Sequence, residues 1–253
     1  MLKHSFFLIS LLGASSLFAS NYAISVSADT TKFDYAETTS SGLLDTERAD
    51  YGKVSGFSVA LTPRHNGFYL SASYAKGDTD YVGSILGSGN PYGSAVGITR
   101  NEISDYTFGY KATAKLDPRG GWEMPVTVGI GYRRWLRQLG YDELYDWGYY
   151  DAGVGLHYAF SSKLSLGVDG NYRKAFNSQM YENLHGYTFN LQNVHGYKIT
   201  VPLEVKLDQK LSIFGSYNYE YWNIGASNPV GGYYEPDSET KNETLSFGLK
   251  LNF

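Results

Sequence analysis

Asp78 and Asp80 come closest, in type and spacing, to a catalytic group. They stand one residue apart in Gly77-Asp78-Thr79-Asp80, at the end of a predicted strand, and a pair of carboxyl groups can serve as acid and base. An acid pair beside a loop is, however, more often simply solvated. No Ser-containing motif sets a nucleophile beside a base, and the glycines lack phosphate-cradling spacing. We therefore predict no catalytic residue.

Metal and cofactor chemistry is also not expected. The chain has no Cys, which excludes disulfides, thiolate metal ligands and a lipid-modified cysteine. His185 and His195 are too isolated for a metal site, and His157 is interpreted as a hydrogen-bonded residue of a strand's inner face. We predict neither a metal nor a cofactor.

The beginning of the sequence predicts export. Lys3 and His4 precede an apolar segment, Phe6 to Leu12, and small residues follow from Ser15 to Ser20, as in a signal peptide. We predict a signal peptide over 1–19, with cleavage after Ser20 as an alternative, and one domain over 20–253. After the first twenty residues no apolar run approaches the roughly 18 residues of a spanning helix.

Alternation of apolar and polar residues with period two dominates the remaining chain and predicts β-strands. It is clearest over 243–253 and over 197–207, where Pro202 indicates a local bulge. Eight further strands are predicted over about 21–35, 51–62, 67–80, 103–116, 125–137, 147–160, 163–175 and 210–224.

The second face of these strands is unlike that of a soluble sandwich. It carries Gly, Ser and isolated charges, as in Gly153, Gly155 and His157, and such residues suit a narrow lumen in which opposite walls interdigitate. Closure into a barrel also satisfies every backbone group, as lipid requires. We expect lumen charges of both signs to pair, since unpaired buried charge is costly; they are Arg133, Asp151, Asp169, Arg173, Glu204, Lys206, Glu220 and Lys250.

The connections alternate between short ones and long ones, the long ones covering about 36–50, 81–102, 138–146, 176–190 and 225–242. Long loops at one end and tight turns at the other are typical of outer-membrane barrels. Tyrosines toward the long-loop ends and phenylalanines toward the turn ends predict two aromatic girdles. The fold class is therefore all-β, a single antiparallel transmembrane β-barrel of ten strands, with eight or twelve as alternatives.

The export signal, the strands and the closing segment 243–253 resemble the small outer-membrane β-barrel proteins of Gram-negative bacteria, a porin-like class. The resemblance implies the cell outer membrane, contact with its lipid and with lipopolysaccharide, and assembly by the barrel assembly machinery. It also implies that this machinery reads the alternating residues Phe247, Leu249, Leu251 and Phe253. We expect a monomer, and the acidic balance of 21 basic against 25 acidic residues does not favour nucleic acid.

The omptins, ten-stranded outer-membrane proteases, pair two acidic residues with an Asp-x-His motif. Asp78 and Asp80 resemble the first half of this constellation, but no His of this chain has an acidic residue two positions before it. The acids of the long loops suggest cation bridging to lipopolysaccharide phosphates or a cation bias, although ordinary solvation is preferred. They are Asp45, Glu47, Asp50, Asp142, Glu143, Asp146, Glu235, Asp237 and Glu239.

We predict a non-enzymatic outer-membrane barrel, either porin-like or a structural surface protein. The alternatives are an outer-membrane enzyme, omptin-like or acting on lipid A, and an adhesin that works through its loops. A mutually placed acid and base at the lumen mouth would favour the enzyme, and a continuous water path would favour the channel.

Overall fold

A computed structural model describes residues 21–84, 89–117 and 121–253. The predicted signal peptide, 1–19, lies outside the described residues. Ten strands account for most of the described chain: β1 (Tyr22–Thr39), β2 (Gly42–Pro63), β3 (Gly67–Gly83), β4 (Ala95–Lys115), β5 (Trp122–Gln138), β6 (Asp142–Ala159), β7 (Leu164–Glu182), β8 (Thr188–Lys206), β9 (Leu211–Ser227) and β10 (Asp237–Asn252). The described residues include no helix long and apolar enough to cross a membrane.

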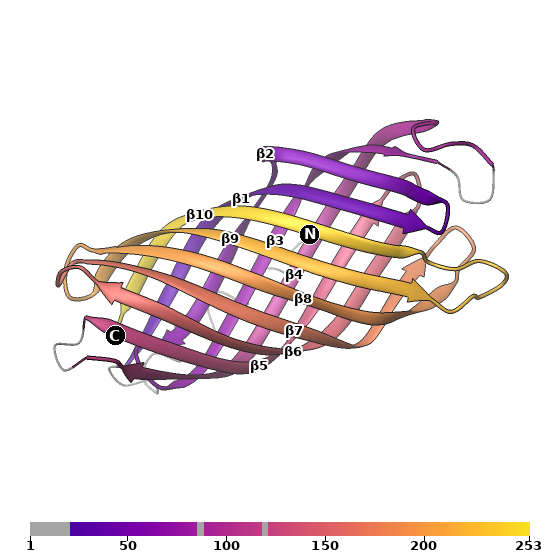
Figure 1. Cartoon of the computed structure of the whole chain (residues 1–253). Coiled ribbons are helices and arrows are strands. Elements are labelled where there is room, and N and C mark those ends of the chain that lie inside the picture. Colours follow the sequence, from indigo (N-terminus) through magenta and orange to yellow (C-terminus); the bar gives the residue numbers. More distant parts are fainter. Residues whose placement is uncertain (1–20, 85–88, 118–120) are drawn as a thin grey trace, which may run out of the picture.

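The strands form one closed antiparallel barrel in which each strand pairs with its neighbours in sequence and β1 pairs with β10. Figure 1 shows the ring. The β1–β10 register runs without a shift from Ala23↔Asn252 to Thr38↔Asp237. Closure leaves no sheet edge unpaired, and the prediction of a ten-stranded antiparallel barrel is confirmed.

The two ends of the barrel are distinct. The first described residues and Phe253 lie at one end, where the Phe253 N–H donates to the Tyr22 carbonyl over 2.9 Å; we call this the terminal end and the opposite one the distal end. The distal connections are shorter than predicted, because β1 and β2 continue through the expected loop over 36–50 and leave only residues 40 and 41 between them. The period-two alternation fades there because both faces of the strands carry polar groups, while backbone pairing continues.

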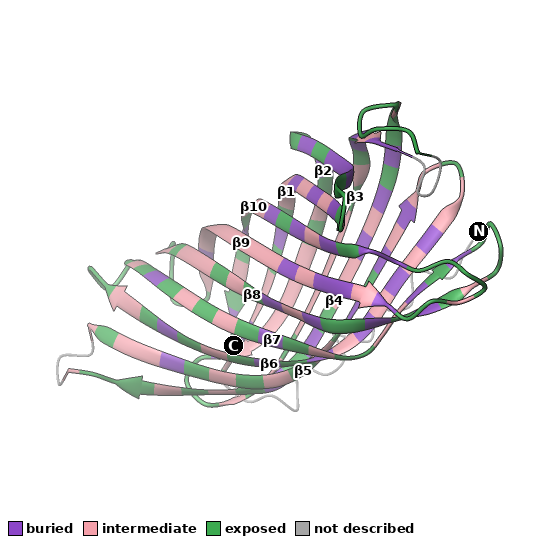
Figure 2. Ribbon diagram, turned by 45° about the vertical axis from the view of Figure 1, so that its right-hand side comes forward, coloured by how far each residue is buried: buried purple, intermediate pink, exposed green. Residues whose placement is uncertain are grey.

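Burial divides each strand into two stretches. Inward side chains of the distal half are almost fully buried, whereas inward side chains of the terminal half are of intermediate burial, as the bands in Figure 2 indicate. We call these two parts of the interior the distal lumen and the terminal lumen. The same strands therefore enclose a sealed compartment and a solvated one.

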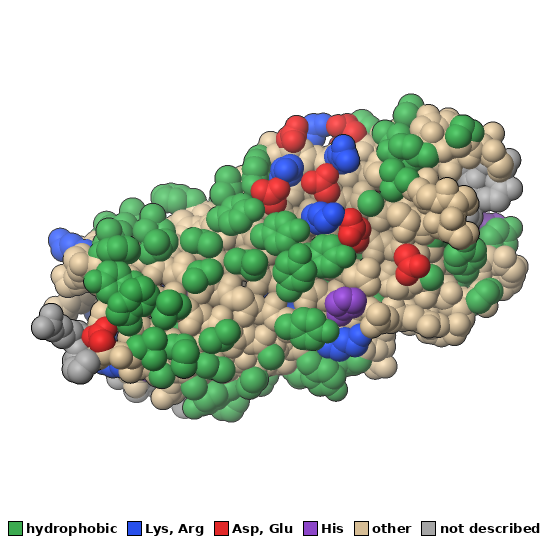
Figure 3. All heavy atoms as spheres, viewed as in Figure 1, with side chains coloured by type: hydrophobic (Ala, Val, Ile, Leu, Met, Phe, Trp, Pro, Cys, Tyr) green, Lys and Arg blue, Asp and Glu red, His purple; other side chains and the backbone are tan. Residues whose placement is uncertain are grey.

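The outer wall is divided in the same way. Apolar side chains on the outside of the terminal half are exposed, for example Val128, Phe247 and Leu249 at 57%, 67% and 54%. Figure 3 shows hydrophobic side chains over the terminal half of the visible wall and charged ones gathered farther along it, over β10, β1 and β2. An exposed apolar band of this size is not expected of a protein surrounded only by water.

Candidate functional site

Aromatic side chains fill the distal lumen. Trp135, Trp147, Trp222, Tyr145 and Tyr149 are at most 1% exposed although they project from three strands, β5, β6 and β9. The rings of Trp147 and Trp222 meet with centroids 5.2 Å apart, and those of Trp135 and Tyr145 are 4.7 Å apart. This aromatic plug gives the distal lumen the packing of an ordinary protein core.

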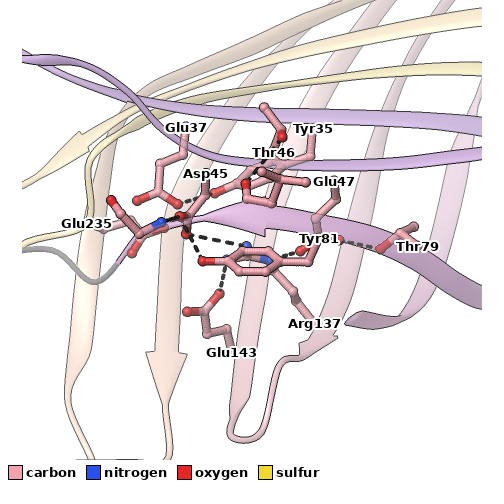
Figure 4. Close-up of polar contacts among 12 residues, drawn as sticks. Tyr35, Glu37, Asp45, Thr46, Glu47, Thr79, Tyr81, Arg137, Glu143 and Glu235 are labelled. Atoms are coloured by element: carbon pink, nitrogen blue, oxygen red, sulfur yellow. Dashed lines mark hydrogen bonds and ion pairs between the residues drawn. The ribbon is translucent and has the colours of Figure 1, made fainter. Parts of the chain in front are cut away.

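A buried guanidinium stands above the plug, toward the distal end. Arg137 of β5 lies in a ring of acidic side chains that Figure 4 shows converging from several strands. Its Nη1 donates to Glu143 Oε2 over 2.6 Å, its Nε donates to Glu47, and its Nη2 lies 3.8 Å from Asp45 Oδ2. Its guanidinium also packs over the ring of Tyr35, 4.6 Å from the centroid, a favourable cation–π contact.

Tyrosine hydroxyl groups donate hydrogen bonds to three acids of this ring. Tyr35 donates to Glu37 Oε2 over 2.7 Å, Tyr81 donates to Asp45 Oδ1 over 2.8 Å, and Tyr145 donates to Glu235. We call Glu37, Asp45, Glu47, Glu143 and Glu235 with Arg137 the Arg137 cluster. Five carboxyl groups thus share one guanidinium in a space closed to solvent.

Burial determines the protonation of the Arg137 cluster. Desolvation raises the pKa of Glu37 to about 8, against the attraction of Arg137, and burial also raises the pKa of Glu235 well above its ordinary value. The pKa of Asp45 is raised for the same reason. Because an excess of buried negative charge is costly, Glu37 keeps its proton at neutral pH.

A second charge cluster lies on the terminal side of the plug. Arg173 Nη1 lies 2.7 Å from Glu220 Oε2 and its Nε 2.9 Å from Asp151 Oδ2, while Arg133 Nη1 lies 2.6 Å from Glu220 Oε1. Asp105 lies 3.4 Å from Arg133. Four of the predicted lumen charges, Arg133, Asp151, Arg173 and Glu220, are thus brought together, and Asp105 joins them.

The other predicted lumen charges lie in the terminal lumen. Lys250 Nζ is 2.7 Å from Glu204 Oε2, and His157 Nε2 is 2.9 Å from Asp169 Oδ1. Lys206, near the terminal end of β8, is exposed and takes no ion pair with any described residue. Gly155 and Gly167 lie against the His157–Asp169 pair, and the side chains of both pairs remain partly open to solvent.

Asp78 and Asp80 lie on the outside of the barrel. Asp78 Oδ1 is 3.2 Å from Arg100 Nε, and Asp80 Oδ2 is 2.7 Å from Lys53 Nζ. These residues line a hollow of about 420 Å³ in the outer wall. The acid pair faces away from the lumen, and each of its members is neutralised by a basic neighbour.

The acids predicted in solvated loops are the main correction to the sequence analysis. Asp45 and Glu47 belong to β2, Glu143 belongs to β6, and Glu235 is buried although it lies in a connection. The strand residues face inward because the period of two continues past the girdle; Arg133, Trp135 and Arg137 follow the same period in β5. This continued period of two is the sequence signal that could have identified these strand residues as inward-facing. No three described His, Asp or Glu side chains are placed to hold a metal ion.

The predicted assembly residues lie on the outer face of β10 and at the residue that follows it. Phe247, Leu249, Leu251 and Phe253 are 67%, 54%, 44% and 37% exposed. Phe247, Leu249 and Leu251 pair with Ala28, Val26 and Ile24 of β1, which continue the apolar surface across the closing seam.

Comparisons with known proteins identify a fold. No family model matches the sequence, and no curated protein matches it. Among solved structures, the barrel is similar to the outer membrane protease OmpT from Escherichia coli, with a TM-score of 0.58 and 12% identity over 92% of this chain and 97% of that one. The translocator domain of the autotransporter NalP from Neisseria meningitidis also matches, with a TM-score of 0.45 and 11% identity over 97% and 96% of the two chains.

A third match is a mutant of the monoaromatic hydrocarbon channel TodX, with a TM-score of 0.41 and 10% identity over 94% of this chain and 92% of that one. These three proteins are a protease, a translocator domain and a channel. At these identities the likeness establishes the barrel fold alone, and a fold does not determine a function.

Proposed function

We propose that this protein is a non-enzymatic outer-membrane barrel that acts as a structural surface protein and conducts little or nothing. The observation that carries the proposal is the aromatic plug, with the two charge clusters on either side of it. A porin-like path would require a continuous aqueous lumen, and here the distal lumen is packed like a core. The barrel is interpreted as a cup that opens only at the terminal end.

The membrane setting is supported by the outer wall. Its apolar band covers the terminal half and ends at outward tyrosines such as Tyr106, Tyr150 and Tyr172, each at least half exposed. Tyrosine rings of this kind favour the boundary between hydrocarbon and headgroups. In this orientation the terminal end faces the periplasm, and the distal half, with its charged outer wall, projects from the cell.

The enzymatic alternative has little support beyond the fold. The acid pair that resembles half of the omptin constellation faces outward and is neutralised by Lys53 and Arg100. The acids inside the mouth, in the Arg137 cluster, are buried and are not reachable by a substrate. No described His lies within ion-pair distance of either group.

A surface role through the distal connections is favoured by one further observation. His185 stacks on Tyr233 with centroids 4.9 Å apart and Tyr187 lies beside them, so the β7–β8 and β9–β10 connections hold each other. Leu184, at 62% exposure, and Tyr233, at 51%, leave apolar surface facing outward. The rigid barrel would present this patch, and loops carried by such scaffolds often bind partners.

Planar-bilayer recording of the refolded protein tests the proposal. We expect no stable conductance steps from the wild type and expect steps from a Trp147→Ala/Trp222→Ala double variant, which removes the centre of the plug. Cell fractionation is the companion measurement and should place the chain in the outer membrane. Large, stable steps from the wild type would overturn the structural reading in favour of a channel.

A further inference from the structure

Outward basic residues of the distal half divide into two groups according to their partners. On β10 and β1 to β4, six of them each have a carboxylate on the outer wall. The pairs are Lys32–Glu243 at 2.9 Å, Arg48–Asp34 at 3.4 Å, Lys53–Asp80 at 2.7 Å, Arg100–Asp78 at 3.2 Å, Lys241–Glu239 at 2.6 Å, and Lys76–Glu102. This sector of the wall neutralises itself.

On β5 to β8 the pattern changes. Arg134 of β5 and Lys174 of β7 are exposed, and neither forms an ion pair with any described residue. The carboxylate opposite Arg134, Asp146, instead accepts hydrogen bonds from Gln179 over 3.2 Å. Lys174 is therefore an exposed cation without a carboxylate partner among the described residues.

Lys174 stands directly opposite His195 in the β7–β8 register, and both side chains face outward. An anion placed between them would accept a hydrogen bond from Lys174 Nζ. Asn193 orients both side chains: Lys174 Nζ donates to Asn193 Oδ1 over 2.7 Å, and His195 Nδ1 donates to the Asn193 carbonyl over 2.9 Å. The other ring nitrogen of His195, Nε2, has no hydrogen-bond partner among the described residues and donates to an anion when the ring is protonated.

The backbone beside this pair is irregular. Asn193 and Asn177 have φ near 50° and are the non-glycine residues with positive φ in the described chain. They lie on neighbouring strands, next to shifts in register. Such conformations cost energy and concentrate where a particular arrangement of side chains is needed.

Aromatic rings place Lys174 at the height of lipid headgroups. Tyr150, which is 60% exposed, is its partner in the β6–β7 register, and the ring of Phe176 lies 4.8 Å from that of Tyr150. Tyr172 precedes Lys174 on the same outer face. Because tyrosines mark the edge of the hydrocarbon, a cation just beyond them meets headgroup phosphates.

We propose that Lys174 and His195 bind the phosphate of a glycolipid in the outer leaflet. The inference rests on the proposed function, since the distal half must project from the outer membrane for these residues to meet that leaflet. The phosphate supplies the negative charge that carboxylates supply in the other sector, through charge-assisted hydrogen bonds. The acyl chains would lie along the apolar wall below Tyr150 and Tyr172.

Titration of the protein, refolded in detergent, with lipopolysaccharide tests the site by native mass spectrometry and by the thermal midpoint. We expect saturable binding to the wild type, binding weakened about fivefold or more by Lys174→Gln, and rescue by Lys174→Arg. Lys53→Gln is the matched control, because it removes a basic residue at a similar height that already has a carboxylate partner. It should bind as the wild type does.

Three further ligands identify the source of the anion. Dephosphorylated lipopolysaccharide and inorganic phosphate alone should each fail to raise the thermal midpoint. Equal binding by Lys174→Gln and the wild type, or equal binding of the dephosphorylated lipid, would overturn the site. Equal binding of phosphatidylglycerol would overturn the assignment to a glycolipid. None of these results depends on conductance or cell fractionation, so a failure here is distinct from a failure of the proposed function.

Discussion

The distal and terminal lumens are built by the same ten strands, yet they resemble two different kinds of protein. In the distal lumen, large aromatic side chains and Arg137 exclude solvent; in the terminal lumen, glycines, serines and spaced ion pairs such as Lys250–Glu204 admit it. A ten-stranded ring is wide enough for either outcome. The comparison shows that side-chain size, and not strand number, decides whether such a barrel is a plug or a cup.

The largest loss of stability is expected from a substitution in the aromatic plug. Trp222→Ala deletes a fully buried ring and should lower the free energy of unfolding by about 3–5 kcal/mol, because the cavity cannot refill. Ser73→Ala, on the inward face of the terminal half, should change it by less than about 0.5 kcal/mol. Urea unfolding of the refolded proteins, followed by near-ultraviolet circular dichroism, measures both values. Similar costs at the two positions would mean that the two lumens are packed alike.

Charge substitutions on the outer wall compare the outside of the terminal half with the outside of the distal half. Val201→Arg places a cation in the apolar band and should cost about 2–4 kcal/mol in a bilayer, whereas Ile98→Arg in the distal half, where the wall meets water, should cost little. Lys198→Ala, on the inward face of β8, should also be mild. Unfolding in lipid vesicles gives the three values. Equal tolerance of Val201→Arg and Ile98→Arg would contradict the assigned membrane level.

The Arg137 cluster predicts a pH dependence confined to the distal half. The folded pKa of Glu37, about 8, lies above its ordinary value of 4.5, so the folded chain retains a proton that the unfolded chain releases between these values. Its contribution to stability is therefore complete below about pH 4.5 and is lost as the pH rises toward 8. Thermal midpoints at pH 6 and pH 9 should differ in the wild type and differ less in Glu37→Gln. Glu239→Gln, on the outer wall, is the control and should keep the wild-type difference.

The smallest change in stability is expected at Phe253. Its ring lies at the terminal end and is partly exposed, so Phe253→Asp should alter refolding in detergent only slightly. We propose that the assembly machinery reads this residue together with Phe247, Leu249 and Leu251. The yield of folded protein in the outer membrane, measured by heat-modifiable migration in gels, should then fall several-fold. Unchanged assembly in cells would leave Phe253 as one interfacial aromatic among many.

The sequence predicts the terminal half well, because there the two faces of each strand contrast sharply. Leu245, Phe247 and Leu249 alternate with Ser246 and Gly248, and in the proposed orientation lipid on one side and water on the other enforce this pattern. All ten strands were predicted from it.

The distal half is harder to predict from the sequence, since its outer face carries charged side chains and its inner face contains both charges and aromatics. Glu47, Glu143 and Glu235 therefore look like loop acids until Arg137 is placed among them. The Arg137 cluster joins residues far apart in sequence, and no local spacing reveals their meeting.

The seam between β1 and β10 also governs the timing of folding. Sixteen register pairs join Ala23 through Thr38 to residues more than 190 positions later, so the first strand waits with an open edge until the last has arrived. Contacts this distant along the chain slow folding, and an exposed edge invites pairing with other chains. A chain whose ring has not yet closed is therefore open to pairing with other chains along the edge of β1.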